Sequence, residues 1–157
     1  MNHDLNKALS GISGILVTPY CEKGNIAPPK LEPIIDRALN AGVHMPVVNG
    51  NTGEFYALTT DEACAMVRDV AAIVNNRAPL LAGVGRSISD ACKLAEVSVE
   101  AGASALMIHQ PPDPFVSPRG MIEYVKTVAQ ASGDLPIMLY LRNDAIGTDA
   151  IKDLCDI

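Results

Sequence analysis

Short apolar runs alternate with longer amphipathic stretches along this chain, with a period of about thirty residues. Apolar residues occupy successive positions in these runs, which is typical of parallel strands that are buried on both faces. Strands are expected at residues 14–20, 45–50, 79–85, 105–110 and 136–141. Each run is followed by a polar or Gly/Pro loop and then by a helical pattern, so the chain is predicted to form five βα units.

The expected helices carry their own start and stop signals. Thr59 and Glu62 have the spacing of a capping box, and Ser117 precedes a proline that suits the first turn of a helix. Pro33 lies inside the pattern of the first long helix and is expected to disturb it. Glycines suited to the left-handed conformation mark three helix ends, at Gly42, Gly102 and Gly133.

Two architectures fit a row of five βα units. One is a doubly wound sheet, and the other is a (β/α)8 TIM barrel, which needs about 200–250 residues. The 157 residues suffice for a single domain, 1–157, in which 1–10 form an N-terminal lead-in. A barrel of this length would be incomplete and would contain only its first five βα units. Period and length alone leave both architectures open.

Composition narrows the classes of function. The net charge of −6 and the lack of a basic run argue against a nucleic-acid surface. No signal peptide is expected, and no apolar run approaches the roughly 20 residues of a membrane helix. The four cysteines are scattered without a Cys-x-x-Cys pair, so no metal site is expected. Reduced cysteines that pack as small apolar residues favour a cytoplasmic location.

The loop that follows the second expected strand, residues 49–55, combines glycine with a hydroxyl residue. Gly50 and Gly53 flank Thr52 at the carboxyl end of that strand. Glycine permits a sharp turn and close approach to a ligand. Successive N–H groups in such a turn can bind a carboxylate as well as a phosphate, and Thr52 adds a hydroxyl donor. Spacing alone nevertheless favours an ordinary glycine turn before a helix.

Four motifs, in order, extend this observation: Thr18-Pro19, Gly50-x-Thr52-Gly53-Glu54 with Leu58-Thr59 and Glu62, Gly83-Val84-Gly85, and Leu135-Pro136-Ile137-x-Leu139-Tyr140. Together they resemble the dihydrodipicolinate synthase / N-acetylneuraminate lyase family. The resemblance runs from Gly11 to the end of the chain, which makes it far more specific than one glycine motif. The resemblance favours the (β/α)8 barrel over the doubly wound sheet.

The resemblance implies a reaction through a covalent imine. Family members join a lysine to the ketone of a 2-oxo acid such as pyruvate, and the imine withdraws electrons from the neighbouring bond. By resemblance, Gly50, Asn51, Thr52 and Gly53 would hold the carboxylate, and Tyr140 would relay protons at the end of its strand. The resemblance implies no metal and no organic cofactor. It also implies a homo-oligomer, either a dimer or a tetramer.

The imine lysine of the family belongs at the end of a sixth strand. The sequence ends at Ile157, within the fifth expected helix. Six lysines are present, and none lies at the carboxyl end of an expected strand: Lys7, Lys23, Lys30, Lys93, Lys126 and Lys152. The chain by itself is therefore expected to lack Schiff-base activity, even if its parent protein has it.

Three departures argue against dihydrodipicolinate synthase proper. Asn51 replaces the first of two threonines in the glycine loop, and an amide cannot pass on a proton as a hydroxyl does. The segment 111–113 reads Pro-Pro-Asp where the synthases carry tyrosine, and Ala145 stands where they place an arginine. Dihydrodipicolinate synthase activity therefore stays only as an alternative.

Other polar residues at strand ends suit a sugar-derived 2-oxo acid. His109 and Gln110 end the fourth expected strand, and Arg142 follows the fifth. His109 suits a structural role equally well, and Arg142 also suits a surface position. The loop from Gly50 to Phe55 is similar to that of the family's sugar-acid dehydratases. The sequence thus predicts a lyase that catalyses aldol cleavage, aldol condensation or dehydration.

Two further alternatives belong to other classes. A non-catalytic fragment or scaffold would leave the first and fifth strands exposed at the edges of the sheet. A small doubly wound domain that binds an anion would need no further strands.

Overall fold

The computed structural model describes residues 5–113, 115–142 and 146–157. It has a parallel sheet made of β1 (Ser13–Ile15), β2 (Met45–Val48), β3 (Leu81–Val84), β4 (Ala105–His109) and β5 (Ile137–Tyr140). The strands lie in the order β1-β2-β3-β4-β5, so each strand pairs with its neighbour in sequence. All five expected strands are confirmed, and each is shorter than expected.

The α-helices are α1 (Leu5–Leu9), α2 (Leu31–Asn40), α3 (Thr60–Val74), α4 (Ile88–Glu100), α5 (Pro118–Ala131) and α6 (Thr148–Cys155). Short 3-10 segments are η1 (Pro28–Lys30), η2 (Asn51–Gly53) and η3 (Phe55–Ala57). Among the described residues, no helix has the length and apolar composition needed to cross a membrane.

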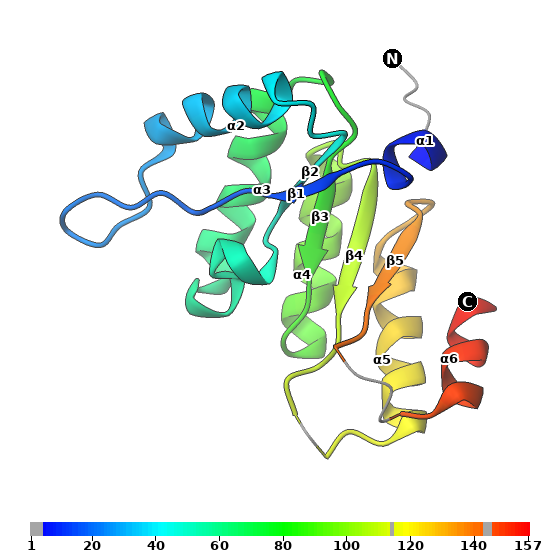
Figure 1. Ribbon diagram of the computed structural model, residues 1–157. Helices are drawn as coiled ribbons and strands as arrows, with labels where there is room; N and C mark the ends of the chain where they lie inside the picture. Colours follow the sequence, from blue (N-terminus) through cyan, green and yellow to red (C-terminus); the bar gives the residue numbers. More distant parts are fainter. Residues whose placement is uncertain (1–4, 114, 143–145) are drawn as a thin grey trace.

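The position of the helices distinguishes the two architectures. Figure 1 shows α2 to α6 along one face of the sheet, and consecutive helices from α2 to α6 contact one another. A doubly wound sheet has helices on both faces and a strand order that reverses at a switch point. A sequential parallel order with helices on one face is instead the wall of a (β/α)8 barrel. The doubly wound alternative is therefore wrong.

Side chains alternate between the two faces of the sheet. One set packs under the helices and includes Val48, Ala82, Leu106 and Ile108. The other set lines the opposite, inner face and includes Met45, Val47, Leu81, Ala105 and Met107. Ala8 of α1 joins this inner cluster, so the lead-in 1–10 contains a helix that covers the start of the strands.

The expected helix boundaries are largely confirmed. The Thr59 hydroxyl accepts from the Glu62 N–H at 3.2 Å, and the Glu62 carboxylate accepts from the Thr59 N–H at 2.7 Å. Ser117 accepts from the Gly120 N–H at 3.1 Å. The expectation for Pro33 is wrong, because Pro33 is the third residue of α2. An N–H at that position has no partner within its helix, so proline removes no bond there.

Candidate active site

The carboxyl ends of the strands meet at one end of the sheet, and His109 links three of them. Its Nε2 lies 2.9 Å from the carbonyl oxygen of Asn49, the residue that follows β2. The imidazole also lies edge-on to the ring of Tyr140, with ring centres 5.6 Å apart. Its side chain crosses β3 between these contacts and is 1% exposed. This arrangement supports a structural role for His109, and a direct substrate contact stays a prediction.

Two glycines of β3 and its exit make room for that imidazole. A Cβ atom on Gly83 would overlap the Asn49 carbonyl oxygen and would lie 2.8 Å from His109 Nε2. A Cβ atom on Gly85 would lie 3.0 Å from His109 Cβ and 3.4 Å from the ring of Phe55. Glycine at position 83 therefore has a steric cause, since a Cβ atom there would displace the Asn49 carbonyl or the His109 ring, and Gly85 leaves only a tight fit beside His109 and Phe55.

Burial fixes the protonation state of His109. The Asn49 carbonyl can only accept, so Nε2 carries the proton and Nδ1 carries the lone pair. Nδ1 is buried without a hydrogen-bond partner among the described residues. Burial lowers the pKa of His109, and the cations Arg142 and Arg86 lower it further. The ring is therefore neutral at neutral pH.

Gln110, Tyr140 and Arg142 are brought together where β4 and β5 end. The Gln110 N–H donates to the Tyr140 carbonyl at 3.1 Å, and the Gln110 side-chain oxygen accepts from the Arg142 N–H at 3.0 Å. The Tyr140 side chain is 40% exposed, and Arg142 is exposed. Ala145, the position expected to lack an arginine, lies outside the described residues.

The loop from Gly50 to Gly53 packs on β1 and the residues that follow it. The Thr18 hydroxyl is buried and donates to the Gly53 carbonyl at 2.6 Å. A Cβ atom on Gly50 would lie 2.7 Å from the Ile15 side chain, and one on Gly53 would lie 2.6 Å from the Leu16 carbonyl oxygen. Close packing on the first strand, rather than a sharp turn, thus requires glycine at these two positions.

Non-glycine residues make the turns on either side of this loop. Asn49 and Glu54 have left-handed backbones, with φ of 58° and 63°. The N–H groups of Gly53 and Glu54 close turns within the loop. A carboxylate bound here would therefore meet the amides of Asn51 and Thr52. Thr52 itself is exposed.

Sequence reasoning missed a cluster beside His109. Phe55 is fully buried, with its ring stacked on the His109 ring at 4.9 Å and with Arg86 Cζ 4.4 Å from its ring centre. The Arg86 guanidinium donates to the Phe55 carbonyl oxygen and, at 3.5 Å, to the Thr60 hydroxyl. Tyr56 adds a third aromatic ring, 5.9 Å from His109. Arg86 directly follows Gly83-Val84-Gly85, so its place after a strand was a usable signal.

The lysines are placed as expected. All six lie in the part of the chain that the structure describes, and none stands where a strand ends. Lys7, Lys93, Lys126 and Lys152 are on α-helices, Lys30 is in η1 and Lys23 is in the loop after β1.

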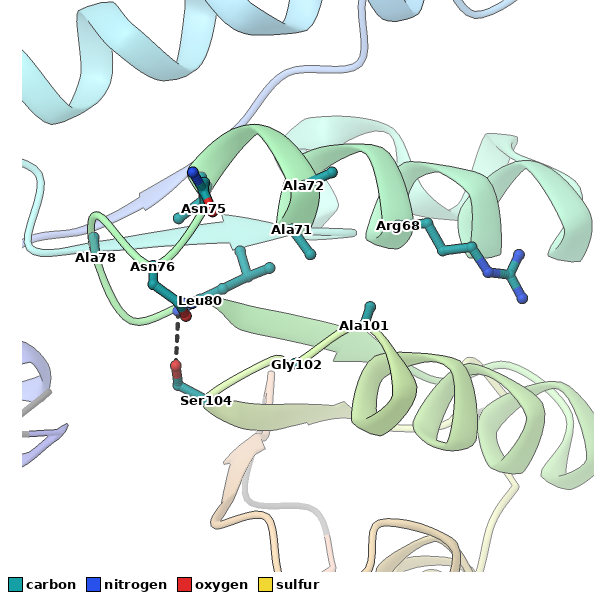
Figure 2. A pocket seen from close by; sticks show the side chains of 11 residues that line it. Arg68, Ala71, Ala72, Asn75, Asn76, Ala78, Leu80, Ala101, Gly102 and Ser104 are labelled. Carbon is teal, nitrogen blue, oxygen red and sulfur yellow. Dashed lines mark hydrogen bonds between the residues drawn. The ribbon is translucent and has the colours of Figure 1, made fainter. Parts of the chain in front are cut away.

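A separate cavity of about 380 Å³ lies at the opposite end of the strands. Figure 2 shows it between the ends of α3 and α4, where the Leu80 N–H donates to the Ser104 hydroxyl at 3.2 Å. The turn beside it contains Asn75 and Asn76, both left-handed. Barrel enzymes carry their chemistry at the carboxyl ends of the strands, so this cavity is not part of the candidate site.

Comparison with known proteins identifies the family. The model of the dihydrodipicolinate synthetase family matches residues 8–154. The chain belongs to this family. Its members among the matched proteins include 4-hydroxy-tetrahydrodipicolinate synthase of Bacillus subtilis, which is 38% identical over 82% of this chain and 44% of its own length. A probable 5-dehydro-4-deoxyglucarate dehydratase of Bacillus licheniformis is 30% identical over 98% of this chain and 50% of its own length.

Solved structures of the family share the fold. The dihydrodipicolinate synthase of Bacillus clausii has a TM-score of 0.90 at 36% identity and is matched over 98% of this chain and 52% of its own. YagE of E. coli K12, solved in complex with pyruvate, has a TM-score of 0.85 at 29% identity, over 93% of this chain and 50% of its own. The chain spans about half the length of the relatives that it matches. Its five βα units therefore form part of a family barrel.

Proposed function

We propose that the protein to which this chain belongs is a Schiff-base-forming lyase that acts on a sugar-derived 2-oxo acid. The observation that carries the proposal is the set of groups at the rim of this family barrel. The Tyr140 phenol, the Gly50–Gly53 loop and the neutral His109 all lie at the carboxyl ends of the strands. The pyruvate complex of the related YagE adds support for a 2-oxo acid as ligand.

Each group at the rim has a proposed role in the reaction. The amides of Asn51 and Thr52, with the Thr52 hydroxyl, would receive the carboxylate of the substrate. A lysine amine condenses with the ketone and releases water, and the resulting imine withdraws electrons from the adjacent bond. By the family resemblance, that lysine lies at the end of a sixth strand, outside residues 1–157. Tyr140 would transfer the proton at the imine carbon and at the leaving group.

The polar residues around Tyr140 favour a hydroxylated substrate. Gln110 and Arg142 are hydrogen-bonded to each other where β4 and β5 end, next to Tyr140, and their side chains would bind hydroxyl groups. The match to a probable 5-dehydro-4-deoxyglucarate dehydratase covers nearly the whole chain. The proposed reaction is therefore aldol cleavage, aldol condensation or dehydration of a sugar-derived 2-oxo acid.

The imine supplies the electron sink, so the proposal includes no metal and no organic cofactor. We expect a cytoplasmic homo-oligomer, either a dimer or a tetramer.

Borohydride trapping tests the proposal on the full-length protein. Incubation with pyruvate and borohydride should reduce the imine to a stable secondary amine, which mass spectrometry detects as a covalent adduct. The Tyr140→Phe variant should form the adduct more slowly and should turn over substrate about 10²–10⁴-fold more slowly. A full-length protein that forms no adduct with pyruvate would overturn the proposal.

Dihydrodipicolinate synthase activity is the second candidate, because the synthase of Bacillus subtilis is 38% identical to the chain. Asn51 argues against dihydrodipicolinate synthase activity. The Asn51 side-chain oxygen is buried without a hydrogen-bond partner among the described residues, and an amide cannot relay protons as a hydroxyl does. Formation of 4-hydroxy-tetrahydrodipicolinate by the purified protein would decide for this candidate.

A further inference from the structure

A second phenol, that of Tyr56, lies near the first at the same rim. The rings of Tyr56 and Tyr140 both lie edge-on to the His109 ring, with ring centres 5.9 Å and 5.6 Å from it. Each tyrosine is 40% exposed, whereas the imidazole that both contact is 1% exposed. Both phenols therefore pack on one buried ring, and each keeps part of its own surface exposed.

The backbone that carries Tyr56 is firmly held. Tyr56 lies in η3 directly after Phe55, which is fully buried between the His109 ring and the Arg86 guanidinium. That guanidinium also donates to the Phe55 carbonyl oxygen. A binding group on such a support is already in place before a ligand arrives, which reduces the entropy cost of binding.

The Tyr56 hydroxyl is only weakly engaged by the protein. It donates to the Gln110 carbonyl oxygen at 3.5 Å, which is long for an O–H donor. Tyr124 shows the contrast of a structural tyrosine, because it is 4% exposed and donates to the Arg86 carbonyl at 3.3 Å. A weak bond at an exposed position leaves the Tyr56 hydroxyl able to turn towards a ligand.

The charges around Tyr56 keep this hydroxyl a donor. Burial raises the pKa of Tyr56, Tyr140 raises it further, and the cations Arg142 and Arg86 offset only part of the rise. The phenol therefore stays protonated at neutral pH. The neighbouring guanidinium of Arg142 suits the oxygen-rich part of a sugar acid.

We propose that Tyr56 is a specificity-determining residue whose hydroxyl binds the hydroxylated carbons of a 2-oxo acid held with its keto end at Tyr140. The inference rests on the proposed function. Imine formation itself needs the carboxylate and the keto carbon of the substrate, which the loop and Tyr140 serve. A hydroxyl donor at Tyr56 distinguishes 2-oxo acids that carry further hydroxyl groups from pyruvate, which has none.

Imine trapping with two compounds tests this role in the full-length protein. One compound is pyruvate, and the other is 5-dehydro-4-deoxyglucarate, which carries hydroxyl groups beyond the carbon next to its ketone. The Tyr56→Phe variant should need about five- to tenfold more of the hydroxylated acid for half-maximal trapping, the loss expected for one hydrogen bond. Its trapping curve for pyruvate should match that of the wild type, which also shows that the site is folded. Tyr124→Phe is the matched control and should leave both curves unchanged.

The outcomes separate the two proposals. Wild-type protein that traps neither compound overturns the proposed function and this inference with it. Wild-type protein that traps both, with Tyr56→Phe curves that overlay those of the wild type, overturns the inference alone. Equal losses for pyruvate and the hydroxylated acid would assign Tyr56 a structural role and also overturn it. The inference would also be overturned if Tyr124→Phe showed the same selective loss, or if the wild type trapped only pyruvate.

Discussion

The neutral imidazole of His109 is the residue on which the candidate site is built. It joins the ends of β2 and β4 and contacts three aromatic rings. Protonation would place a charge on a buried ring whose Nδ1 has no hydrogen-bond partner among the described residues. Such a charge is costly because burial removes its hydration.

This burial makes stability depend on pH. The pKa of His109 is lowered in the folded protein, whereas the unfolded chain takes up the proton near pH 6.5. Below that pH the unfolded state binds more protons, so the unfolding free energy should fall as pH decreases, by at most about 1.4 kcal/mol per pH unit. Urea denaturation at about pH 7 and about pH 5.5 measures the fall. His109→Gln should flatten the pH dependence, and an unchanged slope in His109→Gln would contradict this account.

Thr18 is expected to hold the Gly50–Gly53 loop in place. Its buried hydroxyl donates to the Gly53 carbonyl at 2.6 Å. Thr18→Val keeps the shape but leaves that carbonyl unsatisfied, which should cost about 1–3 kcal/mol of unfolding free energy. Urea denaturation measures the loss. Thr18→Ser retains the hydroxyl and should lose clearly less, so equal losses in the two variants would show that the bond is not the cause.

Among the elements, β3 is exceptional because glycine, not a large side chain, faces the site. Gly83→Ala would bring a Cβ atom against the Asn49 carbonyl and the His109 ring. Gly102→Ala is a matched control, since its Cβ atom would meet nothing within 4 Å and only its φ of 80° causes strain. The control should lose about 1 kcal/mol, and Gly83→Ala should lose more. Thermal unfolding compares them; similar losses would mean that the imidazole can move aside.

The elements themselves could be predicted from the sequence, but their lengths could not. Hydrophobic runs located all five strands, and the Thr59–Glu62 capping box placed the start of α3. The first strand was expected to reach residue 20, yet β1 ends at Ile15. β2 ends where Asn49 takes a left-handed backbone. The residues that follow β1 therefore extend beyond the end of β2, the strand with which β1 pairs. Where a ladder ends depends on the neighbouring strand, which periodicity does not reveal.

The site could be predicted only in part, for a related reason. Tyr140 was named through the family resemblance and His109 through its place at the end of a strand, and their roles towards a substrate stay predictions. The joint contacts of Phe55, Tyr56 and Arg86 bring together residues about thirty positions apart. Such contacts arise from packing in three dimensions, and no local spacing marks them.

At the scale of the whole molecule, β1 and β5 are the outer strands of the sheet described here, each with a single strand neighbour. Ile15, Val17 and Tyr140 near these edges are at least 40% exposed. A polypeptide limited to residues 1–157 should therefore self-associate, because unpaired edges and apolar surface attract further chains. Sedimentation velocity over a range of concentrations tests this. Charge placed at the edge by Ile15→Lys should weaken the association, and a stable monomer at all concentrations would contradict it.

The sequential strand order has a consequence for how the protein is made. Each strand after β1 pairs with the one synthesised just before it. Each βα unit can therefore dock as soon as it leaves the ribosome, without waiting for a distant partner. The newest strand always leaves an unpaired edge, as β1 does, so a pause in translation between units is the moment at which a chaperone would be needed most.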